Sequence, residues 1–305
     1  MSGKEEFDGF YIVDAHQHFQ DLEQNYYPWL CDKDAPEKLE GDLTAIRKTY
    51  LPAEYRQEIA GYTVRKTVHV QNGWDPRDPL GETKWLHDLA SSAGLPDAIV
   101  AYADLAAPGV DELLAGHAAY PLVRGIRQIL NWDEIALYRV ALRPDLMNDV
   151  AWRRGFALLA KHNFSFDLQI YWQQMEMAFA LGSDFPETQL VLDHFGMPVD
   201  RSAEGIDHWS SAMERLARAP NVAVKLSGFG LGHPRWSLED TVPLLTRTID
   251  LFGSARVMVG TNLPVDRLFS NSTQVFDALA AAISSLEPTQ KKAVLSGNAE
   301  RIYKI

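Results

Sequence analysis

The chain has little cysteine, few basic residues for its length, and no long apolar run. The single cysteine, Cys31, excludes an internal disulfide framework and any cysteine-based zinc site. Lysine and arginine number 29 against 41 acidic residues, and the net charge of −12 argues against a nucleic-acid partner, which needs a basic face. No apolar stretch is long enough to cross a bilayer, and the first residues lack the apolar core of a signal peptide. We therefore expect a cytoplasmic protein without nucleic-acid or membrane partners, and the sequence leaves open whether it forms a homo-oligomer.

What remains is the composition of an ordinary globular enzyme. Of the 305 residues, 46% are hydrophobic and 23% are charged. This length suits one large domain or two ordinary ones. Because no linker or shift in composition interrupts the chain, we expect a single domain spanning residues 1–305.

Eight short segments are apolar and β-branched, and each is bounded by polar residues or by glycine and proline, as is typical of buried strands. They are 11–19, 67–71, 98–103, 123–129, 165–170, 189–194, 222–227 and 256–261. Helical spacing occurs in 82–93, 152–162, 175–181, 209–218, 241–251 and 274–285. The alternation predicts an α/β fold, the (β/α)₈ TIM barrel. An open doubly wound sheet is the alternative, but no Gly-x-Gly-x-x-Gly turn follows the first strand.

A barrel of this kind carries its chemistry at the C-terminal ends of the strands. The polar residues found there are His16, His18, Gln71, Arg127, Gln169, Tyr171, His194, Lys225, Ser227 and Asn262, with Asp266 just beyond. Alternation along the first strand places His16 and His18 on one face, where two imidazoles can bind a divalent cation or polarise an oxygen. Alternation in the sixth segment is expected to turn His194 inward and Asp193 toward the helices.

Three of these residues have side chains suited to particular tasks. A lysine in a barrel strand is costly to bury without a partner, so Lys225 is interpreted as a cation for the substrate. The planar fork of Arg127 is suited to a carboxylate or a carbonyl. His194 is the candidate proton carrier, because an unperturbed imidazole titrates near neutrality.

Several motifs, in this order along the chain, resemble one known family. They are Val13-Asp14-Ala15-His16-Gln17-His18-Phe19, Val68-His69-Val70-Gln71, Val123-Arg124-Gly125-Ile126-Arg127, Leu192-Asp193-His194-Phe195-Gly196, Val224-Lys225-Leu226-Ser227-Gly228 and Gly297-Asn298-Ala299-Glu300-Arg301-Ile302-Tyr303. The chain resembles the amidohydrolase superfamily, in the lactonase branch that includes 2-pyrone-4,6-dicarboxylate lactonase and the fuconolactonase and rhamnonolactonase group. The resemblance implies an amidohydrolase-like barrel that hydrolyses a cyclic ester.

The chain departs from the family's metal-binding pattern in three places. Metal-binding members use the two histidines of strand one, ligands from strands four to six, and an aspartate ending strand eight that is also the base. Here Arg127 stands where a lysine would bridge two metals, strand five ends in Gln169 and Tyr171, and Asn262 replaces the aspartate. We therefore expect no required cofactor, with Asp266 as the reserve base. The alternative is one divalent cation, such as zinc, on His16, His18 and His194.

The leading hypothesis is a hydrolase that opens a lactone of a sugar acid or of a related carboxylated ring, a small and anionic substrate. His16, His18 and Lys225 would stabilise the oxyanion, and Asn262 would hydrogen-bond at the mouth. Gln71 and Arg127 would orient the ring, with Gln169, Tyr171 and Ser227 as further binding residues. The alternatives are a metal-dependent amidohydrolase or decarboxylase, and a lactone-binding barrel without turnover.

Overall fold

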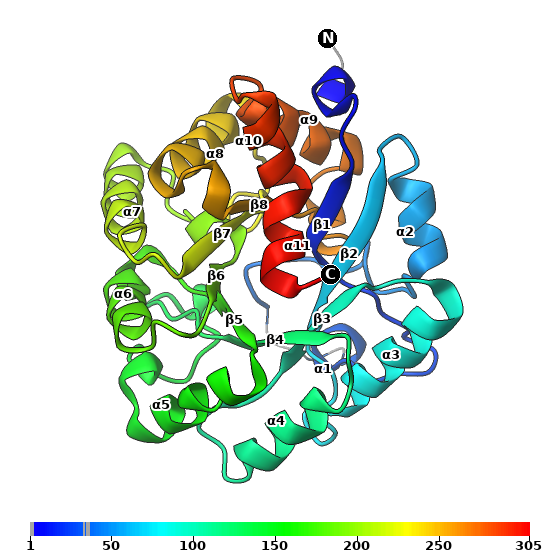
Figure 1. Cartoon of the computed structure of the whole chain (residues 1–305), viewed down its shortest axis with the longest axis vertical. Coiled ribbons are helices and arrows are strands. Elements are labelled where there is room, and N and C mark those ends of the chain that lie inside the picture. The colour runs from blue at the N-terminus through cyan, green and yellow to red at the C-terminus, as the bar shows by residue number, and fades with distance from the viewer. Residues whose placement is uncertain (1–2, 33, 35–36) are drawn as a thin grey trace.

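Eight parallel strands form a ring that encloses the centre of the molecule (Figure 1). The structure is a computed structural model that describes residues 3–32, 34 and 37–305. The strands pair in sequence order: β1 (Ile12–Gln17), β2 (Val64–Val70), β3 (Ala98–Tyr102), β4 (Val123–Ile129), β5 (Ser165–Gln169), β6 (Leu190–Leu192), β7 (Val222–Leu226) and β8 (Val257–Val259). This arrangement confirms the predicted (β/α)₈ barrel.

The ring closes between its first and last strands. The segment that follows β8 is joined to β1 by two backbone hydrogen bonds, from Asn262 N to His16 O and from His18 N to Leu263 O, both 2.7 Å. Gly260 permits this close approach, because a Cβ atom there would lie 2.7 Å from the Cβ of His16. The closure brings Asn262 next to the two histidines of β1.

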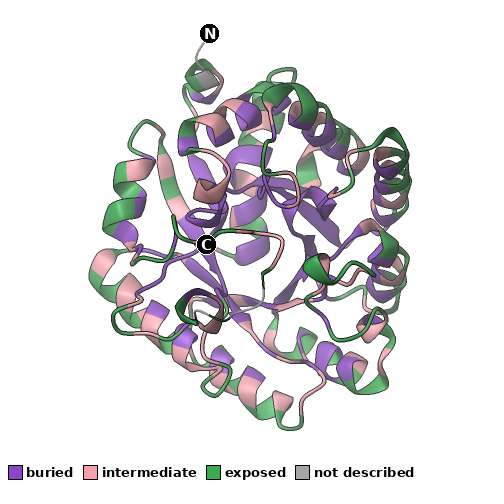
Figure 2. Cartoon of the chain, turned by 180° about the vertical axis from the view of Figure 1, so that it is seen from behind, coloured by how far each residue is buried: buried purple, intermediate pink, exposed green. Residues whose placement is uncertain are grey.

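Most of the helices lie around the ring, with their apolar faces against the strands (Figure 2). They are α1 (Pro28–Cys31), α2 (Pro52–Glu58), α3 (Gly81–Ala93), α4 (Val110–Ala118), α5 (Val150–Ala157), α6 (Met175–Asp184), α7 (Ala203–Leu216), α8 (Leu238–Phe252), α9 (Ser272–Ile283), α10 (Pro288–Lys292) and α11 (Asn298–Tyr303). The sequence did not reveal α1, α2, α4, α10 and α11, and it made the sixth and eighth strands longer than they are. Throughout the described ranges, none of the helices combines the length and the apolar character that crossing a membrane requires.

At the end where the strands begin, the barrel interior is filled with small and β-branched side chains. Val13, Val68, Ala98, Val191 and Ala223 belong to this inner cluster. Helix α11 covers it, contributing Ala299, Ile302 and Tyr303. Because this end is plugged, access to the interior comes from the opposite end, where the strands finish.

Candidate active site

A cavity of about 720 Å³ opens at the C-terminal ends of the strands. Seven of the predicted site residues line it: His18, Gln71, Arg127, Gln169, Tyr171, His194 and Asn262. Four others are not among the lining residues and lie buried behind them: His16, Lys225, Ser227 and Asp266. The predicted residues are therefore arranged in two layers, one facing the cavity and one supporting it.

A break in the regular pairing of β1 turns its histidines inward. Ala15 already faces the barrel interior, so strict alternation would send His16 toward the helices. The register of β1 against β2 shifts between Asp14 and Gln17, and an extra residue there changes which face the following side chains occupy. The rings of His16 and His18 then lie 5.1 Å apart, centroid to centroid.

The end of β6 corrects one expectation about its two polar residues. Asp193 was expected to point toward the helices, and this is wrong. Val191 faces the barrel interior, so alternation also turns Asp193 inward, where it is fully buried. His194 reaches the cavity because its backbone leaves the strand geometry, with φ of 53°.

Asp193 lies at the centre of a buried group of charges. Its Oδ1 is 3.3 Å from Lys225 Nζ and 3.3 Å from His16 Nδ1, and its Oδ2 is 3.5 Å from a guanidinium nitrogen of Arg127. Lys225 also makes a short ion pair with Asp167. Two cations and two carboxylates thus balance one another beneath the cavity, and the sequence analysis had assigned no role in the site to either carboxylate.

The group holds its charges with shifted pKa values. Burial alone would raise the pKa of Asp193, but attraction to Lys225 and His16 outweighs it and holds the pKa well below its usual range. Burial raises the pKa of Asp167, and its ion pair with Lys225 opposes that rise. Burial lowers the pKa of His16 well below its usual value, so its imidazole is neutral at physiological pH.

His194 is held in position by its neighbours on β7. Its Nδ1 lies 3.0 Å from the hydroxyl of Ser227, and a Cβ atom at Gly228 would lie 2.4 Å from the same nitrogen. Burial lowers the pKa of His194 to about 3, so the ring is neutral at pH 7. Ser227 therefore orients the imidazole and leaves Nε2 for another partner, a different role from the substrate contact expected of it.

His18, Asn262 and Asp266 form a polar series along the closure of the barrel. His18 Nδ1 lies 2.6 Å from the carbonyl oxygen of Val70 and donates to it, so neutral His18 carries a lone pair on Nε2. That nitrogen is 3.3 Å from Asn262 Oδ1. Burial raises the pKa of Asp266 to about 7, against the opposing effect of the Asn262 amide and nearby backbone amides.

Arg127 lines the cavity with much of its fork already engaged. One guanidinium nitrogen donates to Gln169 Oε1 at 2.9 Å and the other to the Gln71 carbonyl at 2.5 Å, whereas Nε has no hydrogen-bond partner. Tyr171, the other polar residue after β5, donates to the Tyr138 carbonyl at 2.9 Å. These bonds fix the cationic side of the cavity floor.

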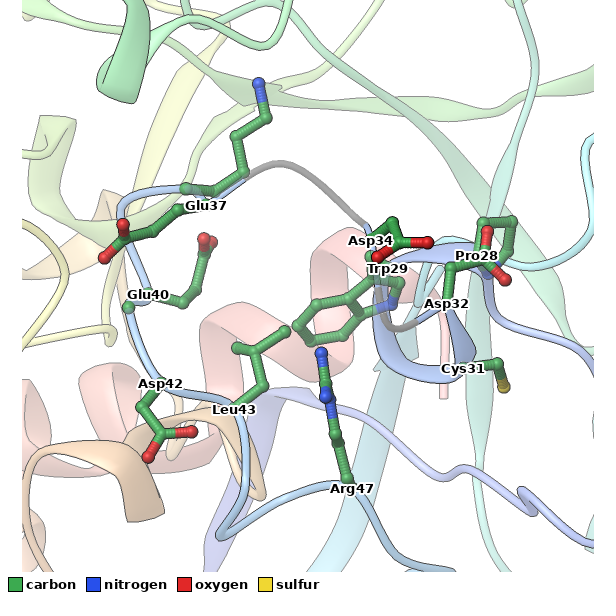
Figure 3. Close-up of a pocket in the computed structure, with 12 residues that line it drawn as sticks. Pro28, Trp29, Cys31, Asp32, Asp34, Glu37, Glu40, Asp42, Leu43 and Arg47 are labelled. Carbon is green, nitrogen blue, oxygen red and sulfur yellow. The ribbon is translucent and has the colours of Figure 1, made fainter.

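Aromatic and apolar residues form the walls of the cavity. Trp29 of α1 and Trp74, in the segment between β2 and α3, both line it. Trp29 also lines a second pocket of about 890 Å³ beside the first, together with Glu37, Glu40 and Arg47 (Figure 3). The walls thus offer flat apolar faces above a polar floor, a combination suited to a ring with polar substituents.

Three groups of the site have donor atoms close enough to share one cation. Ligand atoms of His16, Asp193 and His194 all lie within 4.8 Å of one another. Imidazole nitrogen and carboxylate oxygen are ligands that zinc accepts. Asp193 stands in this group in place of His18, whose Nε2 lies 3.3 Å from Asn262 Oδ1.

Comparison with known proteins supports the same assignment of fold. A family described as Amidohydrolase matches residues 13–305. The protein y4mH of Sinorhizobium fredii is 40% identical over 294 residues, covering 96% of this chain and 98% of that protein. An L-fucono-1,5-lactonase of Burkholderia ambifaria is 28% identical over 300 residues, covering 96% and 95%. The crystal structure of a Burkholderia multivorans amidohydrolase with bound zinc superposes with a TM-score of 0.80 at 26% identity, covering 96% and 99%.

Proposed function

Because the chain belongs to the amidohydrolase family, in its lactonase branch, we propose that it opens a lactone of a sugar acid or of a related carboxylated ring. The observation that carries the proposal is a neutral His194 at the cavity floor, oriented through Nδ1 by Ser227. A likeness to lactonases supports the reaction class. A cytoplasmic location fits a chain with one cysteine.

Hydrolysis of the ring requires a water molecule, a base and a proton for the leaving oxygen. His194 accepts a proton from the water as its oxygen bonds to the lactone carbonyl carbon. When the ring carbon–oxygen bond breaks, the protonated imidazole returns that proton to the leaving alkoxide. The products are a free hydroxyl and a carboxylic acid, and the acid releases one proton at neutral pH.

Negative charge on the carbonyl oxygen develops near the cationic side of the floor. Arg127 lines the cavity there, and Lys225 stands behind it next to His16 and Asp193. One well-placed donor of this kind contributes about 3 kcal/mol to transition-state binding. Lys225 acts from the supporting layer, and not by direct contact with the ring as the sequence suggested.

The same floor and walls orient the substrate. Gln71 and Gln169 present amides to ring hydroxyls, and Trp29 and Trp74 offer apolar faces to the ring itself. The free Nε of Arg127 adds a donor for a carboxylate or a carbonyl. A small anionic lactone could contact the amides, the tryptophan rings and Arg127 at the same time.

Replacing Asn262 with alanine is expected to reduce kcat/KM by about three- to tenfold, because one neutral hydrogen bond contributes about 0.5–1.5 kcal/mol. Steady-state kinetics on the best lactone measures this. Asn262→Asp is the matched comparison, since it introduces the carboxylate found at this position in metal-binding members of the family and has nearly the same shape. A complete loss of turnover in Asn262→Ala would show that the amide takes part in the chemistry.

A metal-dependent amidohydrolase or decarboxylase is the second candidate, and the His16, Asp193 and His194 group is the observation that favours it. When bound there, a divalent cation supplies polarisation of a carbonyl oxygen. The three side chains would hold it from β1 and from the turn after β6. The two candidates differ in whether turnover needs an added metal.

A screen of sugar-acid and carboxylated lactones, with and without a chelator, tests the proposal. We expect proton release from at least one lactone, retained after chelation, because His194 and Arg127 supply the chemistry. Activity lost to the chelator and restored by one metal would favour the second candidate. Saturable lactone binding without hydrolysis would support a barrel that binds the ring without turnover.

A further inference from the structure

Lys225 contacts two of the three side chains that could share a divalent cation, Asp193 and His16. We propose that its ammonium group is a built-in cation that takes the place of a metal at the base of the cavity. What this cation does for the reaction rests on the proposed lactone hydrolysis, but its effect on metal binding does not.

Two of the three candidate ligands already bind the ammonium. Lys225 Nζ lies 3.3 Å from Asp193 Oδ1 and donates to His16 Nδ1 at 3.4 Å. A metal needs a free lone pair on each ligand, and Asp193, the one carboxylate of the three, would have to be shared with the ammonium. His194 and the unpaired Nε2 of His16 have no contact with the lysine, but a metal held by them would lie close to the ammonium and would lack a carboxylate of its own.

The charges around Lys225 are balanced without a metal. The two cations Lys225 and Arg127 face the two carboxylates of Asp167 and Asp193. A divalent ion would add two positive charges within a few ångströms of the ammonium in a buried, poorly screened place. Repulsion there opposes binding even though the ligand types are suitable.

The ammonium is also fixed in place. Lys225 is fully buried, and its short ion pair with Asp167 is continued by a hydrogen bond of 3.0 Å from the Tyr303 hydroxyl to the same carboxylate. The Tyr303 ring lies 5.4 Å from Nζ. Helix α11 thus closes the space into which the lysine would have to withdraw to admit a metal.

The test removes the ammonium and measures metal binding. Lys225→Met combined with Asp167→Asn deletes the ion pair as a unit, so that no unpaired charge is left inside. After chelation and dialysis against zinc, we expect about one bound equivalent in this double variant, with an affinity at least about a hundredfold above that of the wild type. Elemental analysis measures zinc, and the visible spectrum of bound cobalt(II) reports on its ligands.

Three controls make the outcome decisive. Asp193→Asn added to the double variant is expected to abolish the gained site, and Lys225→Arg is expected to stay metal-free because the charge is kept. Circular dichroism establishes that each variant is folded. A folded double variant without zinc would overturn the proposal. A chelated wild type that takes up one equivalent of zinc would also overturn it, and that result can be read even if the double variant does not fold. Because the readout is metal content, failure of every lactone assay would leave this result unaffected.

Discussion

Replacing His194 with alanine is expected to lower kcat by about a hundredfold or more on any lactone that the enzyme opens. The side chain is the neutral imidazole at the cavity floor, and positioned acid–base groups contribute about 10²- to 10⁴-fold to rate. KM should change less than kcat, because proton transfer matters in the transition state more than in the bound substrate. Initial rates over a range of lactone concentrations separate the two constants.

Ser227→Ala is the matched control for the His194 substitution. It removes only the hydroxyl 3.0 Å from Nδ1 and leaves the imidazole in place, so a loss of about three- to tenfold is expected. An unchanged rate in His194→Ala, together with abolished turnover in Asn262→Ala, would reverse the assigned roles. The base would then be sought in the series of His18, Asn262 and Asp266.

Asp193→Asn is expected to reduce the free energy of unfolding at pH 7 by about 3–5 kcal/mol. The substitution keeps the shape of the side chain but removes the carboxylate that faces Lys225 and Arg127, so buried positive charge is left uncompensated. Urea unfolding followed by circular dichroism and by tryptophan fluorescence measures the change, with coincident transitions as the check of a single step. Asp240→Asn, on a partly exposed carboxylate, is the control and should cost much less.

The effect of Asp193→Asn should depend on pH in a defined direction. Its carboxyl pKa is lowered in the folded state, so its contribution to stability is present above the unfolded pKa of about 4. That contribution is lost as the pH falls through the lower folded value, where the carboxylate becomes protonated. The difference between variant and wild type should therefore be full at pH 7 and shrink below about pH 4. A difference that grows toward acid pH would contradict the lowered pKa.

The barrel was predictable from the sequence because its signal is repeated eight times. Each strand is short and apolar, and errors at the ends of β6 and β8 did not change the count. Helices α1, α2, α4, α10 and α11 were missed because four to nine residues give little periodic signal. Helices α2 and α4 supply no residue to the cavity, whereas α1 supplies Trp29 to its wall and α11 covers the opposite end of the barrel.

The inner layer of the site was less predictable because it depends on local irregularities. The register shift in β1 and the left-handed backbone of His194 each change the face that a side chain occupies, and strict alternation describes neither. A signal for Asp167 was present, since a carboxylate between Phe166 and Leu168 in a buried strand must face inward to a partner. Lys225 is equally costly to bury alone, so it is the expected partner of Asp167.

The balanced charges beneath the cavity also bear on how the barrel can be divided. A cut between β4 and β5 would leave Arg127 in one half-barrel, and Asp167, Asp193 and Lys225 in the other. One fragment would then hold a surplus guanidinium and the other a surplus carboxylate, both of which the intact protein buries. Each fragment would bury a charge whose partner lies in the other fragment. We therefore expect the two halves of this barrel to behave as complementary pieces, and neither to fold as an independent module.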